Sequence, residues 1–354
     1  MHLAKMTTVM QEPFPALTYL RLTSRDKDAP VLLDGFLGAT APCLLELSLE
    51  AIPFPALPTL LLSARNLVAL RLSKIPPTGY ISPEAMVTGL AALARVESLS
   101  IRFEKPAPRL ERNHLHPPIQ IVLPTITSFR FEGVSDYLED LVARIDSPRL
   151  NRTVITYRHQ HVQVFQLFRF INSSEDPRLS QFRRLAVCFE YHGLTIIMLS
   201  LSHTHDEIHI SFNFLGMESG VSHLVQVFDQ FSSKLTDVRH LSLGYFRRGP
   251  KIHHNELVQL LQTLPTVQTL IVSGDWMDNS PPALDNVTDE MVAEVLPALG
   301  LLCFNRSLHR SAFFKRFVAV RKHSDRPVTF TRDVGAFLRS SLVAGVTSTE
   351  AMEA

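Results

Sequence analysis

A short apolar phrase returns along almost the whole chain and constrains its fold more than any other feature. The phrase first stands at residues 14–22 as FPALTYLRL, and later copies keep apolar residues spaced as L-x-x-L-x-L. These copies recur every 23 to 30 residues through the first part of the chain. A period of this length, variable but sustained, indicates a repeat protein whose units stack on their neighbours. With the middle apolar residue as a marker, the first copies give Leu20, Leu47, Leu70, Leu99 and Phe129.

The repeat continues to nearly the end of the chain and therefore decides the domain organisation. A length of 354 residues by itself would favour two or three globular domains. Because the repeat fills the chain, we expect one irregular repeat domain of about ten to twelve units over residues 1–345. Residues 346–354 are expected to form a polar tail. The later markers, with a weaker pattern between residues 150 and 220, are Val154, Leu185, Ile208, Leu241, Leu270 and Leu302.

Each unit is predicted to consist of a strand, a loop, a helix and a second loop. The last positions of the phrase alternate apolar and polar residues, which is the pattern of a strand with one buried face. Between the phrases the apolar spacing becomes helical, as in residues 82–94, 134–146 and 255–265. Such a unit buries its apolar face only against its neighbours, so the expected fold class is α/β. We expect a horseshoe-shaped solenoid with parallel strands on the concave side and helices on the convex side.

The strand positions between the apolar residues would form the concave surface of this solenoid. The side chains there are small, polar and mixed in charge. Two proline-bearing stretches, 104–118 and 275–285, interrupt the repeat and are predicted to be surface loops beside this surface. A curved sheet and its loops favour binding of another protein, because the surface is preformed. The candidate partner-binding residues are Tyr19, Arg21, Glu46, Glu50, Arg71, Arg102, Arg130, Glu132, His240 and, in the second loop, Trp276.

The composition disfavours several classes of partner. Lys and Arg total 35 against 34 for Asp and Glu, and a net charge of +1 gives no reason to expect nucleic acid. The start of the chain has no apolar run of secretory length, and the longest runs elsewhere are too short to span a bilayer. The cysteines Cys43, Cys188 and Cys303 lie far apart, which suits a reducing compartment. We therefore expect an intracellular protein, cytoplasmic or nuclear, that has no membrane partner.

Catalytic and metal-binding patterns are weak, so we expect neither an enzyme nor a cofactor. The best metal candidate is the group His203, His205, Asp206 and His209, whose histidines are better interpreted as solvated or hydrogen-bonded. The sequence contains neither the glycine-rich phosphate loop nor the G-x-S-x-G nucleophile motif. A hydrolase that uses a His and carboxylate pair on the repeat scaffold stays open as an alternative.

Two charged helices have structural interpretations. In residues 134–146, the carboxylates Asp136, Glu139 and Asp140 fall opposite the apolar stripe and are expected to face solvent. The basic run from Arg306 to Lys322 is interleaved with aromatic residues. It is expected to form an amphipathic helix that covers the open end of the core.

The strand phrases, the FPAL and LPTV lead-ins, GDW at residue 274 and the segment RFVAVRKHSDRPV resemble the leucine-rich-repeat region of F-box-like proteins of mushroom-forming fungi. The likeness covers nearly the whole chain. It implies a protein-recognition module that holds targets for a cullin-type ubiquitin ligase. Because the first phrase begins at Phe14, we expect no F-box in this sequence, and a ligase adaptor would be a partner only if an F-box lies upstream. A truncated copy, or a stand-alone scaffold with no ubiquitin role, is the alternative.

Overall fold

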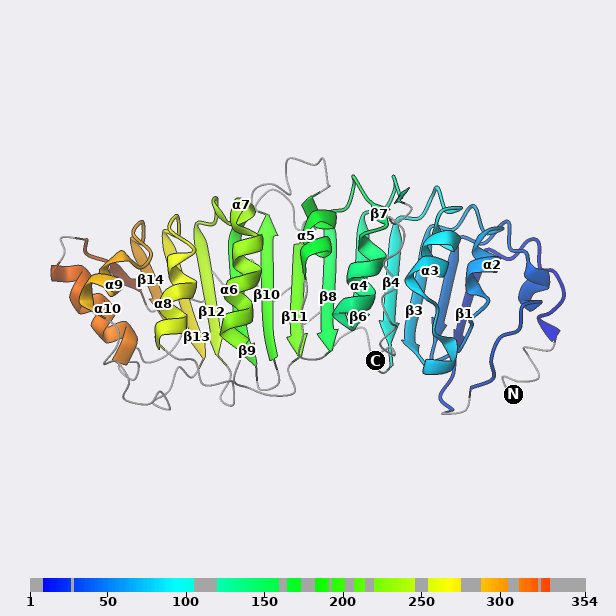
Figure 1. Ribbon diagram of the computed structural model, residues 1–354, viewed down its shortest axis with the longest axis horizontal. Coiled ribbons are helices and arrows are strands. Elements are labelled where there is room, and N and C mark those ends of the chain that lie inside the picture. The colour runs from blue at the N-terminus through cyan, green and yellow to red at the C-terminus, as the bar shows by residue number, and fades with distance from the viewer. Residues whose placement is uncertain are drawn as a thin grey trace, which may run out of the picture. The chain divides into compact units, whose positions relative to one another are not determined.

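The computed structural model folds into two compact units, and each is described by itself (Figure 1). Unit 1 comprises Met1–Ser180 and Ser202–Asn213, and unit 2 comprises Gln181–Leu201 and Phe214–Ala354. The expected single domain over residues 1–345 and the tail over 346–354 stay predictions. The structure describes residues 9–26, 29–104, 120–158, 164–172, 182–190, 193–200, 207–213, 220–245, 254–274, 288–304, 312–323 and 326–331.

Unit 1 is built on a parallel sheet in which the repeat markers stand side by side. Leu20, Leu47, Leu70, Leu99 and Phe129 are register partners from strand to strand. All of these marker side chains are buried, which confirms the repeat phase predicted from the sequence. The strands lie in the order β1 (Tyr19–Thr23), β2 (Glu46–Glu50), β3 (Ala69–Ile75), β4 (Ser98–Phe103), β6 (Ser128–Gly133), β8 (Arg152–Arg158) and β11 (Glu207–Asn213).

The helices of unit 1 cover one face of this sheet (Figure 1). Neighbouring helices pack on one another in chain order from α2 to α5. The helix predicted from Ser82 begins there, since the Ser82 side chain accepts a hydrogen bond from the backbone N–H of Ala85. A separate parallel pair joins β5 (Ile121–Val122) to β7 (Ile145–Asp146). The helical elements are η1 (Phe36–Ala39), α2 (Leu57–Leu61), η2 (Pro77–Gly79), α3 (Pro83–Leu90), α4 (Ser135–Val142) and α5 (Phe165–Asn172).

The lead-in before the strands is a tight turn, and this explains its proline. The backbone N–H of Leu17 donates to the carbonyl of Phe14 at 3.0 Å, and that of Leu150 donates to Ser147 at 3.2 Å. In both turns a proline follows the acceptor residue. Proline presets the φ angle that this second turn position requires. The LPTV phrase forms the same turn, since the N–H of Val267 donates to the carbonyl of Leu264 at 3.4 Å, so these lead-ins bring the chain back to the sheet.

One backbone carbonyl links each strand start to the next in the same way. The carbonyl of Thr18 accepts from the N–H groups of Leu45 and Glu46, at 2.7 and 3.1 Å. The carbonyl of Leu45 then accepts from Val68 and Ala69, at 2.8 and 3.1 Å. Because each bond joins adjacent repeats, the pattern aligns the units without any side chain. The same arrangement recurs at Val68, Glu97 and Thr127 in unit 1 and at Arg239 and Gln268 in unit 2.

The marker predicted on β8 is wrong by one residue. Phe129 and Ile208 both register with Thr153, and Thr153 is 1% exposed, whereas Val154 points to the opposite face. Periodicity alone favoured Val154, because valine is the more apolar residue of the two. Ile155 and Tyr157 continue the buried series from Thr153. The packing of the whole strand therefore outweighs the polarity of one threonine hydroxyl.

Unit 2 contains a sheet of the same kind with one antiparallel strand. The markers Leu185, Leu241, Leu270 and Leu302 are register partners, as predicted. The helices are α6 (Gly220–Gln230), α7 (Ser232–Leu235), α8 (His254–Gln262), α9 (Asp289–Glu294) and α10 (Ala312–His323). The strands lie in the order β10 (Gly193–Ser200), β9 (Phe182–Glu190), β12 (His240–Tyr245), β13 (Thr269–Gly274), β14 (Leu301–Phe304) and β15 (Thr329–Thr331).

The expectation that every strand is parallel and follows chain order is wrong at β9 and β10. These strands pair antiparallel within unit 2, and the next strand along the chain, β11, belongs to unit 1. β9 ends at Glu190 and β10 begins at Gly193, and such a short connection allows only an antiparallel hairpin. Both faces of β10 are buried, as Ile196 and Ile197 show, which accounts for its continuous apolar sequence. Each unit is thus mixed α/β on a mostly parallel sheet, consistent with a leucine-rich-repeat-like solenoid.

The last described helix, α10, packs on α9 as the predicted amphipathic helix. Phe314 and Phe317 are buried in its apolar side. Arg321 is also buried, at 1% exposure, and its Nη2 donates to the carbonyl of Leu299 at 2.9 Å. This arginine therefore belongs to the packing of unit 2 and not to a solvated basic face. None of the helices within the described ranges is long and apolar enough to cross a membrane.

Candidate binding surface on the strand face of unit 1

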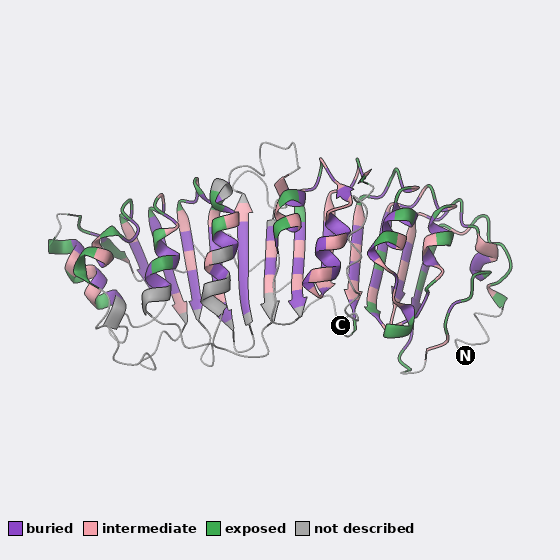
Figure 2. Ribbon diagram, viewed as in Figure 1, coloured by how far each residue is buried: buried purple, intermediate pink, exposed green. Residues whose placement is uncertain are grey.

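The strands of unit 1 expose one face, which we call the strand face. It consists of the side chains on β1, β2, β3, β4, β6, β8 and β11 that alternate with the buried markers (Figure 2). Tyr19 is 65% exposed, and the predicted surface residues Arg21 and Arg71 are exposed as well. The period-two prediction is therefore confirmed for these strands.

The strand register arranges this face in three rows that cross the sheet. The middle row holds an arginine on β1, β3 and β6, with a serine on each strand between them. One flanking row contains Tyr19, Glu46, Ala69, Ser98, Ser128 and Arg152. The other is interrupted by the β3–β4 register shift, with Thr23, Glu50 and Ser73 before it and Arg102, Glu132, Thr156 and Ser211 after it. The middle row runs through Arg21, Ser48, Arg71, Ser100, Arg130, Val154 and His209.

Ion pairs between neighbouring strands connect several predicted residues. Arg71 Nη1 lies 2.9 Å from Glu46 Oε1, and Arg102 Nε lies 2.7 Å from Glu132 Oε2. The Arg102–Glu132 pair is the better protected, because the two side chains are 27% and 13% exposed. Exposed pairs of this kind contribute about 0–1 kcal/mol each to stability. Their larger effect is to hold long side chains in defined positions.

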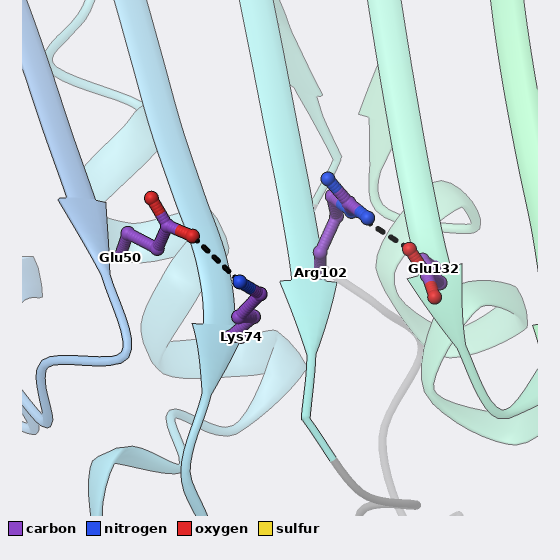
Figure 3. A network of polar contacts seen from close by, with 4 residues as sticks. All are labelled: Glu50, Lys74, Arg102 and Glu132. Atoms are coloured by element: carbon purple, nitrogen blue, oxygen red, sulfur yellow. Dashed lines mark hydrogen bonds and ion pairs between the residues drawn. The ribbon is translucent and has the colours of Figure 1, made fainter. Parts of the chain in front are cut away.

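Lys74 joins this face, although the alternation of the sequence does not place it there. Its Nζ lies 2.8 Å from Glu50 Oε1 (Figure 3). The backbone of Lys74 has a φ of 51°, and the β3–β4 register shifts between Leu72 and Ile75. This irregularity adds a residue to β3 and turns Lys74 towards Glu50. The sequence signal for this bulge is the break in alternation, because the apolar residue after Leu70 and Leu72 is Ile75 and not residue 74.

The pairs leave basic groups next to one another at the centre of the face. In Figure 3, Lys74 on β3 and Arg102 on β4 lie between the carboxylates of Glu50 and Glu132. The hydrogen bond from Lys74 holds the pKa of Glu50 below its usual value against the opposing effect of burial, and the charges of Lys74, Arg21 and Arg102 add to this lowering. Three strands therefore contribute positive charge around one carboxylate.

Two other arginines act on a histidine of β11, the last strand of unit 1. Burial and, to a smaller extent, the charges of Arg130 and Arg152 lower the pKa of His209 to about 4. The His209 ring nitrogen Nε2 lies 3.0 Å from the Ser211 hydroxyl. His209 is thus a neutral, hydrogen-bonded side chain at neutral pH. The other candidate metal ligands, His203, His205 and Asp206, lie outside the described residues.

The strand face does not keep its polar character in unit 2. His240 is half-buried, and burial, followed by the charges of Arg184 and Arg239, lowers its pKa. Ala186, Ile197, Ile271 and Cys303 occupy the corresponding positions and are all buried. The predicted residues His240, Ser242 and Ser273 are half-buried among these apolar residues, and their role in partner binding stays a prediction. In the sequence, residues 269–274 and 301–304 carry apolar side chains at successive positions, which indicates strands that are buried on both faces.

Other predicted features fall outside the surface or outside the described residues. Trp276 and the loops over 105–118 and 275–285 are not among the described residues. In the described ranges, no three His, Cys, Asp or Glu side chains gather as a metal site would require.

Glu139 corrects the expectation of a solvated carboxylate face on α4. It is 6% exposed, and its carboxylate accepts from the backbone N–H groups of Gln166 and Leu167, at 2.7 and 3.0 Å. These two N–H groups begin α5, so Glu139 caps the next helix. Asp136 and Asp140 are half-buried. A helical wheel of α4 alone does not reveal this contact, because the hydrogen-bond donors belong to the neighbouring helix α5.

Comparisons with known proteins give one distant likeness to report. No family model matches the chain, and no curated protein matches it. A solved structure described as the crystal structure of the TLR13–ssRNA13 complex aligns with 14% sequence identity and a TM-score of 0.31. The alignment covers 74% of this chain and 29% of that chain, so the chain spans less than a third of its length. A likeness of this degree defines neither family nor function.

Proposed function

We propose that the chain is a non-enzymatic leucine-rich-repeat module that recognises another protein through the strand face of unit 1. The observation that carries this proposal is the row of arginines at Arg21, Arg71 and Arg130, set on a parallel sheet and flanked by carboxylates. A strand face with alternating charge is a surface for polar recognition, since its backbone is already ordered by the sheet.

The ion pairs support recognition because they preorganise the side chains. Arg71 is anchored to Glu46, Lys74 to Glu50 and Arg102 to Glu132. Ordering a long side chain upon binding costs about 0.5–1.5 kcal/mol, and an anchored side chain has already lost part of that freedom. Each guanidinium has five N–H donors, so one ion pair leaves donors for a partner's acceptors.

The resemblance to fungal F-box-like proteins supplies a narrower proposal. In that proposal the partner is a protein destined for ubiquitination, and a ligase adaptor binds an F-box elsewhere in the polypeptide. It is tested by asking whether the full-length gene product co-purifies with a ligase adaptor. Co-purification would support a receptor role, whereas its failure would favour a stand-alone scaffold with the same recognition surface.

Affinity capture with matched variants tests the recognition surface. We compare the wild-type chain with the double variant Arg21→Glu and Arg71→Glu, and with Arg65→Glu as a control. Arg65 is exposed in the turn before β3 and lies off the strand face. Arg21 and Arg65 are exposed, whereas Arg71→Glu replaces the Glu46 ion pair with two neighbouring carboxylates, so the double variant should lose about 1 kcal/mol and unfolding curves should show that it stays folded.

We expect quantitative mass spectrometry to identify proteins that the wild type and the Arg65→Glu chain retain and that the double variant loses. Binding by purified components then has to reproduce this difference. If the double variant retains every direct partner with unchanged affinity, the binding surface lies elsewhere and the proposal is wrong.

A further inference from the structure

The arginines of the strand face occupy alternate strands, and this spacing is a property of the register. Arg21 on β1, Arg71 on β3 and Arg130 on β6 belong to the middle row, while Ser48 and Ser100 fill the strands between. Adjacent strands in a sheet are about 4.8 Å apart, so successive arginines are anchored about 9.6 Å apart. A ligand that contacts each of them must repeat its acidic group at the same distance.

Regular peptide conformations differ in how well they match this distance. A polyproline II helix presents every third residue on one side, with a repeat of about 9.3 Å. A β-strand presents alternate residues on one side at about 6.7 Å, and two turns of α-helix span about 10.8 Å. The polyproline II mismatch is about 0.3 Å per arginine, whereas the α-helix misses by about 1.2 Å. A polyproline II peptide therefore stays aligned with successive arginines along the middle row.

The residues between the arginines suit the backbone of such a peptide. Ser48 and Ser100 are small, half-buried and carry hydroxyl groups that can donate hydrogen bonds. A polyproline II helix makes no internal backbone hydrogen bonds, so its carbonyls are available as acceptors. Serines at these positions also leave room for the peptide between neighbouring arginine side chains.

The charge of the strand face favours an acidic ligand. Its basic residues Arg21, Arg71, Lys74, Arg102, Arg130 and Arg152 outnumber the described carboxylates Glu46, Glu50 and Glu132. Positive charges contribute to the lowered pKa values of Glu50 on β2 and His209 on β11, although the largest causes are the hydrogen bond from Lys74 and burial, respectively. The carboxylates flank the middle row, which disfavours a broad polyanion and favours separate acidic groups placed over the arginines.

Single-stranded nucleic acid fits this surface less well. Proteins that bind it combine a continuous basic groove with aromatic side chains on which bases stack. Among the described residues of the strand face, the aromatic side chains are Tyr19, on the edge strand, and the half-buried ring of His209. Glu46 beside the middle row would repel a phosphate backbone.

We propose that the middle row of the strand face binds an acidic polyproline II segment of the partner protein, which crosses the strands from β1 to β6 with a carboxylate at every third residue. The inference rests on the proposed function and specifies its ligand. Arg21 and Arg71 are the main contacts because both are exposed, and Arg130 is the third position of the same row.

Fluorescence anisotropy with two labelled peptides of equal composition tests the spacing. The first repeats Glu-Pro-Pro five times, and the second gathers the same glutamates and prolines in separate blocks. The wild-type chain should bind the spaced peptide at least about tenfold more tightly, because only its carboxylates match successive arginines. Arg21→Gln and Arg71→Gln should each weaken binding about fivefold, whereas Arg65→Gln should leave it unchanged.

Each contrary outcome has a defined meaning. Equal affinity for the two peptides would show that the spacing of the carboxylates does not matter. The inference would then be wrong, and the attraction would be non-specific and due to charge. Tighter binding of an oligouridylate of the same charge overturns the inference in favour of nucleic acid. If neither peptide binds while the Arg21→Glu and Arg71→Glu chain still loses its direct protein partners, the inference is wrong and the proposed function stands. If those partners are also retained, the proposed function fails as well.

Discussion

Lys74 reaches across from β3 to hold Glu50 on β2, with 2.8 Å between Nζ and Oε1. It does so with a backbone φ of 51°, which non-glycine residues seldom adopt. The left-handed conformation costs about 1–2 kcal/mol, so the exposed ion pair does not by itself stabilise it. The shift in β3–β4 register between Leu72 and Ile75 shows that the surrounding sheet holds the bulge.

The pair should show a coupling energy that depends on pH. Because Lys74 lowers the pKa of Glu50 in the folded chain, the stabilisation is present above the unfolded pKa of 4.5. It is lost as the pH falls through the lower folded value. A double-mutant cycle with Lys74→Met and Glu50→Gln should give about 0.2–1 kcal/mol at pH 7 and a value near zero at pH 2. Equal coupling at both pH values would show that packing, not charge, joins the residues.

His209 should make the unfolding free energy of unit 1 fall in mild acid. Its folded pKa of about 4 lies below the ordinary value of 6.5, so the folded state favours the neutral ring. The associated stability is fully present above pH 6.5 and is lost as the pH falls towards 4, by about 3 kcal/mol. His209→Gln removes the titrating group and should flatten this part of the stability curve. Urea unfolding of both chains at pH 7 and pH 4.5 measures the difference, and parallel losses would contradict the assignment to His209.

Removal of Glu139 should destabilise unit 1 through the start of α5. Glu139→Ala leaves the part-buried N–H group of Gln166 and the buried N–H group of Leu167 without this acceptor, at a cost of about 1–3 kcal/mol. Glu139→Gln keeps an amide oxygen and should cost less. Asp140→Ala on the same helix is the control and should change stability by no more than about 0.5 kcal/mol. Denaturant unfolding checks the order of the three variants.

Gly89 should resist replacement by the better helix former alanine. A Cβ at Gly89 would lie 2.9 Å from Cα of Pro58 and 3.2 Å from Cδ1 of Leu61, where α3 packs on α2. Relief of this overlap requires the helices to separate, at about 1–3 kcal/mol, which outweighs the helical preference of alanine, about 1 kcal/mol. Thr88→Ala, exposed on the same helix, should be neutral or stabilising. A Gly89→Ala chain as stable as the wild type would refute the close approach.

Arg321 should be essential to unit 2 although it stands in a basic run. Its buried guanidinium donates to the carbonyl of Leu299 and lies 5.9 Å from the ring centroid of Phe317. Arg321→Met fills much of the volume but removes the donor, and we expect a loss of about 1–3 kcal/mol. Lys322→Met, at an exposed position of the same helix, is the matched control. Similar thermal midpoints for the two variants would contradict this role.

Much of the local structure follows from residues close together in the chain. The L-x-x-L-x-L phrase identified the buried face of most strands, and the Ser82 cap marked the start of α3. Proline at the second turn position, as in Pro15 and Pro148, locally favours the turns that the structure shows ahead of β1 and β8. These features depend on side-chain alternation and local hydrogen bonds, so a single sequence contains the information.

The candidate site was predictable as a set of exposed strand residues but not as a network. Alternation identified Arg71, Arg102 and Glu132, whereas it missed Lys74 and gave no indication of the lowered pKa of His209. A bulge changes which side chain points outward, and a pKa depends on every charge that the fold brings near. Neither property is local in the sequence.

By itself, the sequence determined the repeating strand-and-helix unit, because apolar spacing records which side of each element must leave water. Only the tertiary structure decided that Thr153 replaces Val154 in the register, that β9 and β10 form an antiparallel hairpin, and that Glu139 caps a neighbouring helix. It also decided that the polar strand face belongs to unit 1, whereas Ile271 and Cys303 are buried in unit 2. These outcomes depend on contacts between residues far apart in the chain, whose energies no local pattern records.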